Sequence, residues 1–188
     1  MRIQNNNGFT VFEVLVAMAI SITLFGLVLS IYTLSVRSLA SGQNRAELTQ
    51  TSRSTMERIT RDVRETRDIA SNLPENADNP EEPPLSELML EDGHSENLQY
   101  IYYYLNGTDL QRQVRIYYFN EEPEVPVPHN AEDEFGNPPQ MDIISDNKVG
   151  QYVSTILFYG HNPVAVELTL QKSSNMHQTR TLLYGRNL

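Results

Sequence analysis

The first third of the chain contains one unbroken apolar stretch. Residues 14–36 are 23 positions without a charged side chain. As a helix this stretch reaches about 35 Å at ~1.5 Å per residue, whereas the hydrocarbon core of a bilayer is ~30 Å thick. A buried helix of a soluble protein is the alternative, but a protein of this size has little with which to cover so long an apolar run. The pattern therefore predicts a membrane-spanning helix.

Helical periodicity continues beyond the apolar stretch and becomes amphipathic. The apolar positions of one face are Leu48, Met56, Ile59, Val63 and Ala70. The opposite face carries oppositely charged residues spaced four apart, namely Glu57/Arg61, Arg58/Asp62, Arg61/Glu65 and Arg64/Asp68. Pro74 is the first proline of the chain, so no proline interrupts a helix before it. This pattern predicts one helix over residues 9–70, in which the arginines form a solvated face rather than a ligand site.

The rest of the chain has the patterns of strands and loops. Residues 98–105 and 110–119 flank the turn signal Asn106-Gly107 and predict a hairpin. Further strands are predicted over residues 152–159, 164–171 and 179–184, with turns at 160–163 and 173–177 and loops at 74–84 and 121–139. The predicted fold class is α+β, with a long N-terminal helix whose second half packs on an antiparallel β-sheet head.

Length, charge and cysteine content narrow the possible roles. The chain of 188 residues is predicted to divide into a short polar N-terminal segment (1–8), an apolar helix (9–36), an amphipathic continuation (37–72) and a head (73–188). Between Arg37 and Arg67 there are seven arginines and four carboxylates, so the net charge of −10 arises beyond Arg67. An acidic head argues against nucleic acid as a direct partner. Without cysteine, neither zinc–thiolate nor cysteine-nucleophile chemistry is available, and no cofactor is expected.

A single carboxylate lies at the start of the apolar run. Glu13 follows Gly8 by five residues, and Phe9 stands at the edge of the run. A carboxylate near the centre of a bilayer costs about 2.5 kcal/mol or more, so Glu13 should have a partner. The chain has no lysine, arginine or histidine between Arg2 and Arg37. Cleavage after Gly8 would supply a cation, because it creates a positive amine on Phe9 near the start of the helix.

This arrangement resembles the class III signal of type IV prepilins and type II secretion pseudopilins. In those proteins a short leader ends in glycine, phenylalanine usually follows, and glutamate is the fifth residue of the mature chain. Gly8, Phe9 and Glu13 match these positions. The resemblance implies that a prepilin peptidase/N-methyltransferase cleaves between Gly8 and Phe9 and methylates the Phe9 amine. It also implies that Glu13 contacts the Phe9 amine of a neighbouring subunit and so sets the register of a filament.

The resemblance further implies a location and partners. The chain would be a single-pass protein of the bacterial cytoplasmic (inner) membrane with its head outside the cytoplasm, and would then enter a pilus or pseudopilus. Its partners would be the peptidase, other pilins or pseudopilins of the filament, and an assembly-platform membrane protein. Two features depart from the family pattern: Arg2 is the only basic residue of the leader, and the span lacks the central proline of many major pilins.

Two alternatives explain the apolar run without a filament. One is a secretory signal peptide cleaved near Ser38-Leu39-Ala40, whose apolar core would exceed the ~7–15 residues expected of such peptides. The other is a plain signal anchor. Neither accounts for Gly8, Phe9 and Glu13 together.

The head resembles the J-type minor pseudopilins and W-type minor pilins more loosely. This likeness rests on the arginine-rich helix of residues 55–64, the hairpin segment 109–112 and the terminal Gly185-Arg186-Asn187. It implies a minor subunit that is used in few copies, initiates the filament and lies near its tip. A major pilin is the rival within the family.

Other chemistry has weaker signals. An enzyme is not expected, because the chain has no hydrolase or phosphate-loop motif and its histidines are scattered through loops, at positions His94, His129, His161 and His177. Asp133, Asn137 and Asp142 are candidate calcium ligands, but they match no ordered calcium loop, and a solvated acidic loop is the default. No metal site is therefore predicted.

The tyrosines of the hairpin leave a second function open. Tyr100, Tyr102, Tyr103 and Tyr104 alternate between the two faces of the predicted strand. They serve either as a partner-binding surface or as packing for a thin core. Two hypotheses follow: a structural filament subunit, or a tip-displayed adhesin or ligand-binding head presented by the helix.

Overall fold

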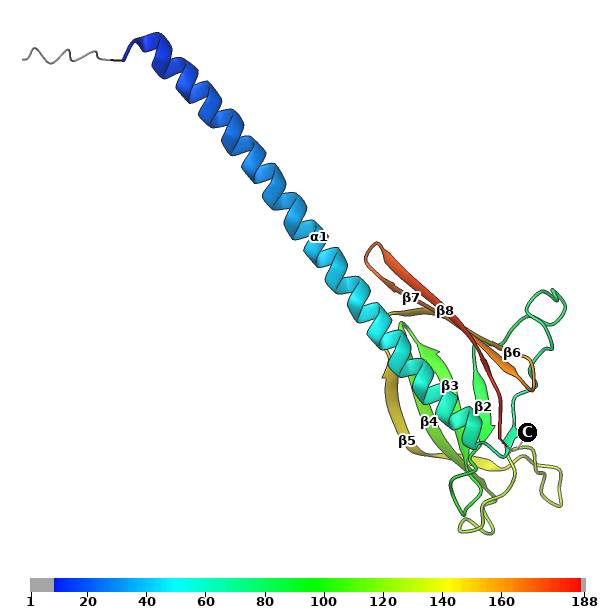
Figure 1. Cartoon of the computed structure of the whole chain (residues 1–188). Helices are drawn as coiled ribbons and strands as arrows, with labels where there is room; N and C mark the ends of the chain where they lie inside the picture. Colours follow the sequence, from blue (N-terminus) through cyan, green and yellow to red (C-terminus); the bar gives the residue numbers. More distant parts are fainter. Residues whose placement is uncertain (1–8, 187–188) are drawn as a thin grey trace, which may run out of the picture. The chain divides into compact units, whose positions relative to one another are not determined.

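The computed structural model describes residues 9–186, so the predicted leader with Gly8, and residues 187–188, lie outside the described residues. The chain forms two compact units, residues 1–43 and residues 44–188. One helix and eight strands make up the described part, and the two antiparallel sheets confirm the predicted α+β class (Figure 1).

Helix α1 (Val11–Glu65) has 55 residues and ends earlier than the sequence predicts. The chain leaves the helix at Thr66, whose hydroxyl donates hydrogen bonds to the carbonyls of Asp68 (2.8 Å) and Glu91 (2.7 Å). Asp68–Ile69 then pairs with another strand as β1. The prediction of helix to Ala70, and of an amphipathic helix to residue 72, is therefore wrong in its last turn and a half.

The first sheet has five strands in the order β1-β2-β3-β4-β5, and every neighbouring pair is antiparallel. The strands after β1 are β2 (Leu88–Glu91), β3 (Tyr100–Asn106), β4 (Asp109–Tyr118) and β5 (Gln140–Gly150). The hairpin β3–β4 confirms the prediction. The sequence did not predict β2 or β5.

The second sheet has three strands in the order β6-β7-β8. Its strands β6 (Val153–Tyr159), β7 (Val164–Lys172) and β8 (Asn175–Leu183) confirm the three predicted strands, but β8 begins four residues early. The predicted turn at residues 173–177 is shorter than expected, because Ser173 adopts a positive φ of 55° and Lys172 already pairs with Asn175. The predicted single sheet is thus divided in two between β5 and β6.

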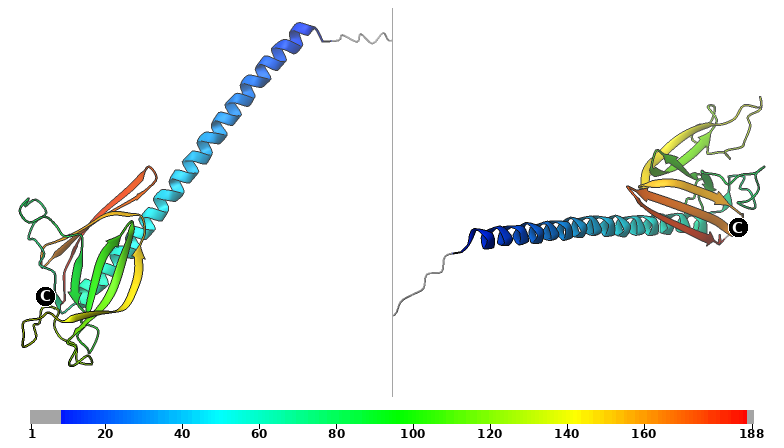
Figure 2. Two further views of the ribbon diagram at one scale, coloured as in Figure 1. Left: turned by 180° about the vertical axis from the view of Figure 1, so that it is seen from behind. Right: turned by 90° about the horizontal axis from the view of Figure 1, so that it is seen from above.

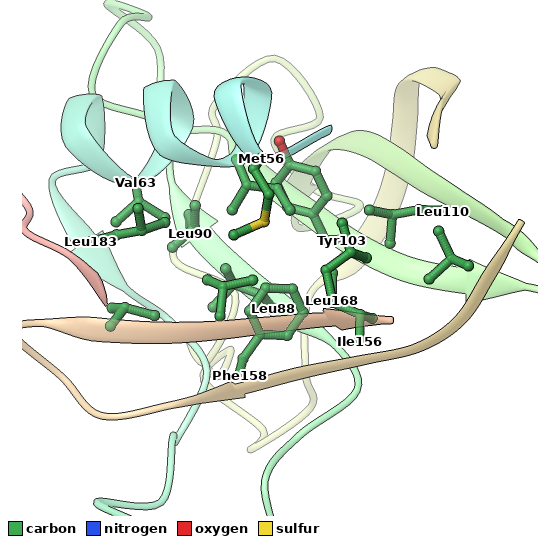
Figure 3. Packing of buried hydrophobic residues seen from close by; sticks show 14 of the residues in the cluster. Met56, Val63, Leu88, Leu90, Tyr103, Leu110, Ile156, Phe158, Leu168 and Leu183 are labelled. Atoms are coloured by element: carbon green, nitrogen blue, oxygen red, sulfur yellow. The ribbon is translucent and has the colours of Figure 1, made fainter. Parts of the chain in front are cut away.

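The core joins both sheets to the C-terminal half of α1. Figure 3 shows Met56 and Val63 of α1 beside Leu88 and Leu90 of β2, with Phe158 of β6 below them. Leu48, Ile59 and Val63 are fully buried. This confirms that the second half of the helix packs on the β-sheet head. Figure 2 gives two further views of this arrangement of the head.

Candidate functional site

The residues at the start of α1 form a capping box. The Thr10 carbonyl accepts the first helical bond from Val14 N (3.2 Å), which makes Thr10 the N-cap residue. Glu13 Oε2 accepts hydrogen bonds from Thr10 N (2.9 Å) and Thr10 Oγ1 (3.0 Å), and Glu13 N donates to Thr10 Oγ1 (3.3 Å). The sequence pattern Thr-x-x-Glu could have revealed this role for Thr10. The contacts hold the Glu13 carboxylate beside the first turn of the helix.

The apolar part of α1 has no protein cover. Phe9 is 87 % exposed, and an apolar 18-residue window of the helix is wholly unburied. The helix is long and apolar enough to cross a membrane. Exposed apolar surface on this scale requires another apolar environment, which lipid or the helices of other subunits can supply.

The hydroxyl groups in this part of the helix bond to its own backbone. Ser21 Oγ donates to the Ala17 carbonyl (2.8 Å), and Ser30 Oγ donates to the Gly26 carbonyl (2.9 Å). Thr23 makes the same kind of bond to Ala19. In a bilayer, polar groups need partners within the segment, and these bonds meet that need.

In the head, a buried ionic cluster joins α1 to the hairpin. Asp62 Oδ2 accepts hydrogen bonds from Tyr103 Oη (2.5 Å) and Arg112 Nε (2.6 Å), and Arg58 Nε lies 3.7 Å from Asp62 Oδ1. The side chain of Asp62 is 5 % exposed and that of Arg112 11 %. Burial, together with the neighbouring Asp62 carboxylate, raises the pKa of Tyr103 well above its usual range. The prediction that Asp62 belongs to a solvated charged face is wrong.

The hairpin tyrosines divide between the two faces of the five-stranded sheet. Tyr103 packs toward α1, whereas Tyr102 and Tyr104 stack on the opposite face with ring centroids 5.5 Å apart. The Arg115 guanidinium lies 3.5 Å from the centre of the Tyr102 ring. Burial, and then a hydrogen bond to Glu87, raise the pKa of Tyr102 to about 12. This outer face is half-buried and polar as well as aromatic.

Two of the candidate calcium ligands, Asp133 and Asn137, bond to each other. Asp133 accepts hydrogen bonds from the backbone of Phe135 (2.8 Å) and Asn137 (2.7 Å) and from the Asn137 side chain (2.8 Å). These bonds, with the Asn137 side chain first, lower the pKa of Asp133. Asp142 bonds to the next backbone amide in β5. Within residues 9–186, no group of three or more histidine or carboxylate side chains could hold a metal ion.

No protein-family model matches the chain. No curated protein matches it either. Fold and site together define an α+β protein with one long apolar N-terminal helix on an antiparallel head, which is compatible with a pilin-like fold.

Proposed function

We propose that this protein is a structural subunit of a filament of the type IV pilus or type II secretion pseudopilus kind. The observation that carries the proposal is the position of Glu13. It is the fifth residue from Phe9, it lies in the first turn of a helix, and the apolar residues that follow it are unburied. Packing of such helices side by side would cover the apolar surface, and a cation from a neighbour would neutralise Glu13.

The processing step follows from the same segment. In this proposal the peptidase cleaves between Gly8 and Phe9 and methylates the Phe9 amine. Thr10 and Glu13 then stand second and fifth in the mature chain. The capping box fixes the Glu13 carboxylate at the helix start, which is where the new amine of an adjacent subunit would meet it.

The finer proposal is a minor subunit that initiates the filament. It rests on the loose likeness of the head to J-type and W-type proteins. Arg112, part of that likeness, bonds to Asp62 of α1 and so joins the hairpin to the helix. The protein would reside in the inner membrane with its head outside the cytoplasm until the assembly platform inserts it into the filament.

The test is the intact mass, together with the mass of the N-terminal peptide, of the protein recovered from cells. A chain that begins at Phe9 and carries one added methyl group supports the proposal. A chain that retains Met1, or begins near Ser41, contradicts it and leaves a signal anchor or a secreted acidic domain.

A tip-displayed binding head is the second candidate function. The favouring observation is the outer face of the five-stranded sheet, where Tyr102, Tyr104 and Arg115 form a stacked group. Gln113 Nε2 bonds to Tyr104 Oη (3.0 Å) and Asp146 Oδ2 (2.8 Å), so the face is rigidly held. Substitutions of Tyr104 that remove adhesion but leave filaments intact would favour this role.

A further inference from the structure

The segment between β4 and β5 builds a pocket lined by apolar residues and carboxylates. The pocket has a volume of about 460 Å³. Its apolar lining comes from Phe119, Val125, Val127 and Phe135, and its carboxylates from Glu121, Glu122, Glu132, Asp133 and Glu134. Phe135 is 86 % exposed and Val125 50 %. In the described part of the chain, none of these carboxylates forms an ion pair.

The charge of this segment is one-sided. Residues 116–147 contain eight carboxylates and no lysine or arginine. Like charges that are gathered without a counter-charge repel one another, and a basic partner would relieve that repulsion. The exposed Phe135 and Val125 add an apolar contact area to the electrostatic one. The pocket is therefore suited to a surface that presents arginine beside an aromatic side chain.

The loop that forms the pocket is anchored to the sheet. The His129 ring packs edge-on against Tyr100 with centroids 5.0 Å apart, and Tyr100 packs in the same way against Tyr117 at 5.5 Å. His129 N donates to Tyr100 Oη (3.3 Å), and Val127 N donates to the Tyr117 carbonyl (2.8 Å). Tyr100 and Tyr117 lie on the face of the sheet turned away from Tyr103 and α1.

A surface with exposed arginines and an exposed aromatic side chain, the features that the acidic pocket would bind, lies at the C-terminal end of α1. Arg61, Arg64 and Arg186 are exposed, and no ion pair of the described residues includes them. The predicted pairs of Arg61 with Glu57 and Glu65 do not form. Arg64 and Arg186 line one hollow together with Tyr184, which is 64 % exposed. Glu65 and His94 also line it and lie 3.6 Å from each other, so two arginines face one carboxylate there. Arg186 N bonds to the Arg64 carbonyl (3.4 Å), which holds the C-terminal segment against the helix end.

We infer that the acidic pocket of one copy receives the Arg64–Tyr184–Arg186 surface of a second copy. The two surfaces have opposite charge, each carries an exposed aromatic residue, and they are attached to opposite faces of the five-stranded sheet. The right-hand view of Figure 2 shows this sheet between the end of α1 and the segment that forms the pocket. A contact between two different surfaces leaves one surface of each kind free at the ends of a pair, so it can be repeated along a filament wherever its rotation does not close a ring. Two adjacent copies suffice, so the contact is compatible with use in few copies.

This inference rests on the proposed filament function and specifies a contact between the heads of two adjacent copies. The absence of cysteine allows a direct test in the full-length protein. Two differently tagged copies are expressed in the same cell, one with Phe135→Cys and the other with Tyr184→Cys, and treated with a short bismaleimide. A crosslinked heterodimer is expected. The matched control replaces Phe135→Cys with Asn76→Cys, which is exposed in the other acidic loop, and little crosslink is expected there.

Charge reversal makes the test specific. Glu134→Arg in the Phe135→Cys copy, or Arg64→Glu in the Tyr184→Cys copy, should each lower the crosslinked fraction about tenfold, because like charges then face each other. The two reversals together should restore it. Equal crosslinking by the Asn76→Cys control, absence of a heterodimer, or no restoration by the double reversal would each overturn the inference. Those outcomes, with a mature chain that still begins at Phe9, would leave the filament proposal standing.

Discussion

At the scale of single residues, Glu13 has an observed role in the capping box and a proposed role in assembly, and mutation can separate the two. In the capping box it needs only a side-chain oxygen acceptor, which glutamine also supplies. In the proposed assembly role it needs its negative charge. We therefore expect Glu13→Gln to preserve the helix start but to abolish filaments. Thr10→Ala should cost about 1 kcal/mol at the helix start and leave filaments in place. Electron microscopy of cells with equal membrane levels of each variant checks both, and normal filaments with Glu13→Gln would contradict the charge role.

The buried cluster around Asp62 gives a second prediction at this scale. Arg112→Met leaves a carboxylate that is 5 % exposed without its closest cation. The free energy of unfolding should fall by about 3–5 kcal/mol. The control is Arg53→Met, because Arg53 and Glu57 form an exposed pair 3.7 Å apart, where the loss should stay below about 1 kcal/mol. Urea unfolding of the detergent-solubilised full chain, followed by tyrosine fluorescence, measures both. Equal losses of unfolding free energy in the two variants would show that Arg112 does not stabilise the cluster.

Tyr103 in the same cluster predicts a loss of stability at alkaline pH. Its pKa in the folded protein lies above the unfolded value of 10.0, so the folded state binds this proton more tightly. The resulting stability is fully present below pH 10.0 and is lost as the pH rises through the folded value. The Tyr103→Phe variant should be less stable at neutral pH and show a smaller decline above pH 10.0. Urea midpoints on both sides of that pH test this, with the exposed Tyr184→Phe as a control that keeps the wild-type decline.

At the scale of elements, the sequence predicts the strands whose side chains follow a periodic pattern. It does not predict a strand that forms only because its backbone pairs with a neighbouring strand. The hairpin β3–β4 has alternating side chains and a turn signal. By contrast, β5 exposes Met141, Ile143 and Ile144 and has no clear alternation; it is a strand because its backbone pairs with β4. The end of α1 was misplaced because the charge spacing continues through Asp68, while the Thr66 hydroxyl redirects the chain.

The candidate functional residues also include some that the sequence predicts and some that it does not. Phe9 and Glu13 could be selected from the sequence because the motif is local. The acidic pocket could not be predicted, because its shape depends on contacts of His129 with Tyr100 and Tyr117, which lie 12 or more positions away in the chain. The composition of this segment indicates the negative charge of the pocket but not which apolar residues line it.

The turn of the β3–β4 hairpin provides a prediction for a single element. Gly107 has a φ of 63°, and a Cβ placed there would meet no other atom within 4 Å. Gly107→Ala should therefore cost about 1 kcal/mol through backbone strain alone. Gly107→Asn should cost less, because asparagine tolerates this conformation better than alanine. The difference between the two variants in urea unfolding checks this, and an equal cost would contradict the explanation by φ.

At the scale of the whole molecule, the buried core and the exposed apolar helix belong to different parts of the chain. All the buried apolar residues of the core cluster lie between Leu48 and Leu183, within the unit of residues 44–188. The exposed large apolar residues of α1 lie before Arg45, from Val11 to Leu39, and Phe9 just before the helix is exposed too. Folding of the head and association with lipid or other helices should therefore be separable.

A fragment of residues 44–188 should fold by itself and remain soluble without detergent. A fragment of residues 66–188 should not, because it loses the four buried apolar residues of α1, namely Leu48, Met56, Ile59 and Val63. At ~1.5–3 kcal/mol each, their burial contributes about 6–12 kcal/mol, which is as large as the ~5–15 kcal/mol stability of a typical domain. Cooperative thermal unfolding with a near-ultraviolet tyrosine signal is expected for the first fragment only. Cooperative unfolding of both would mean that the sheets form a core without the helix. Cooperative unfolding of neither would mean that the head depends on the residues before position 44.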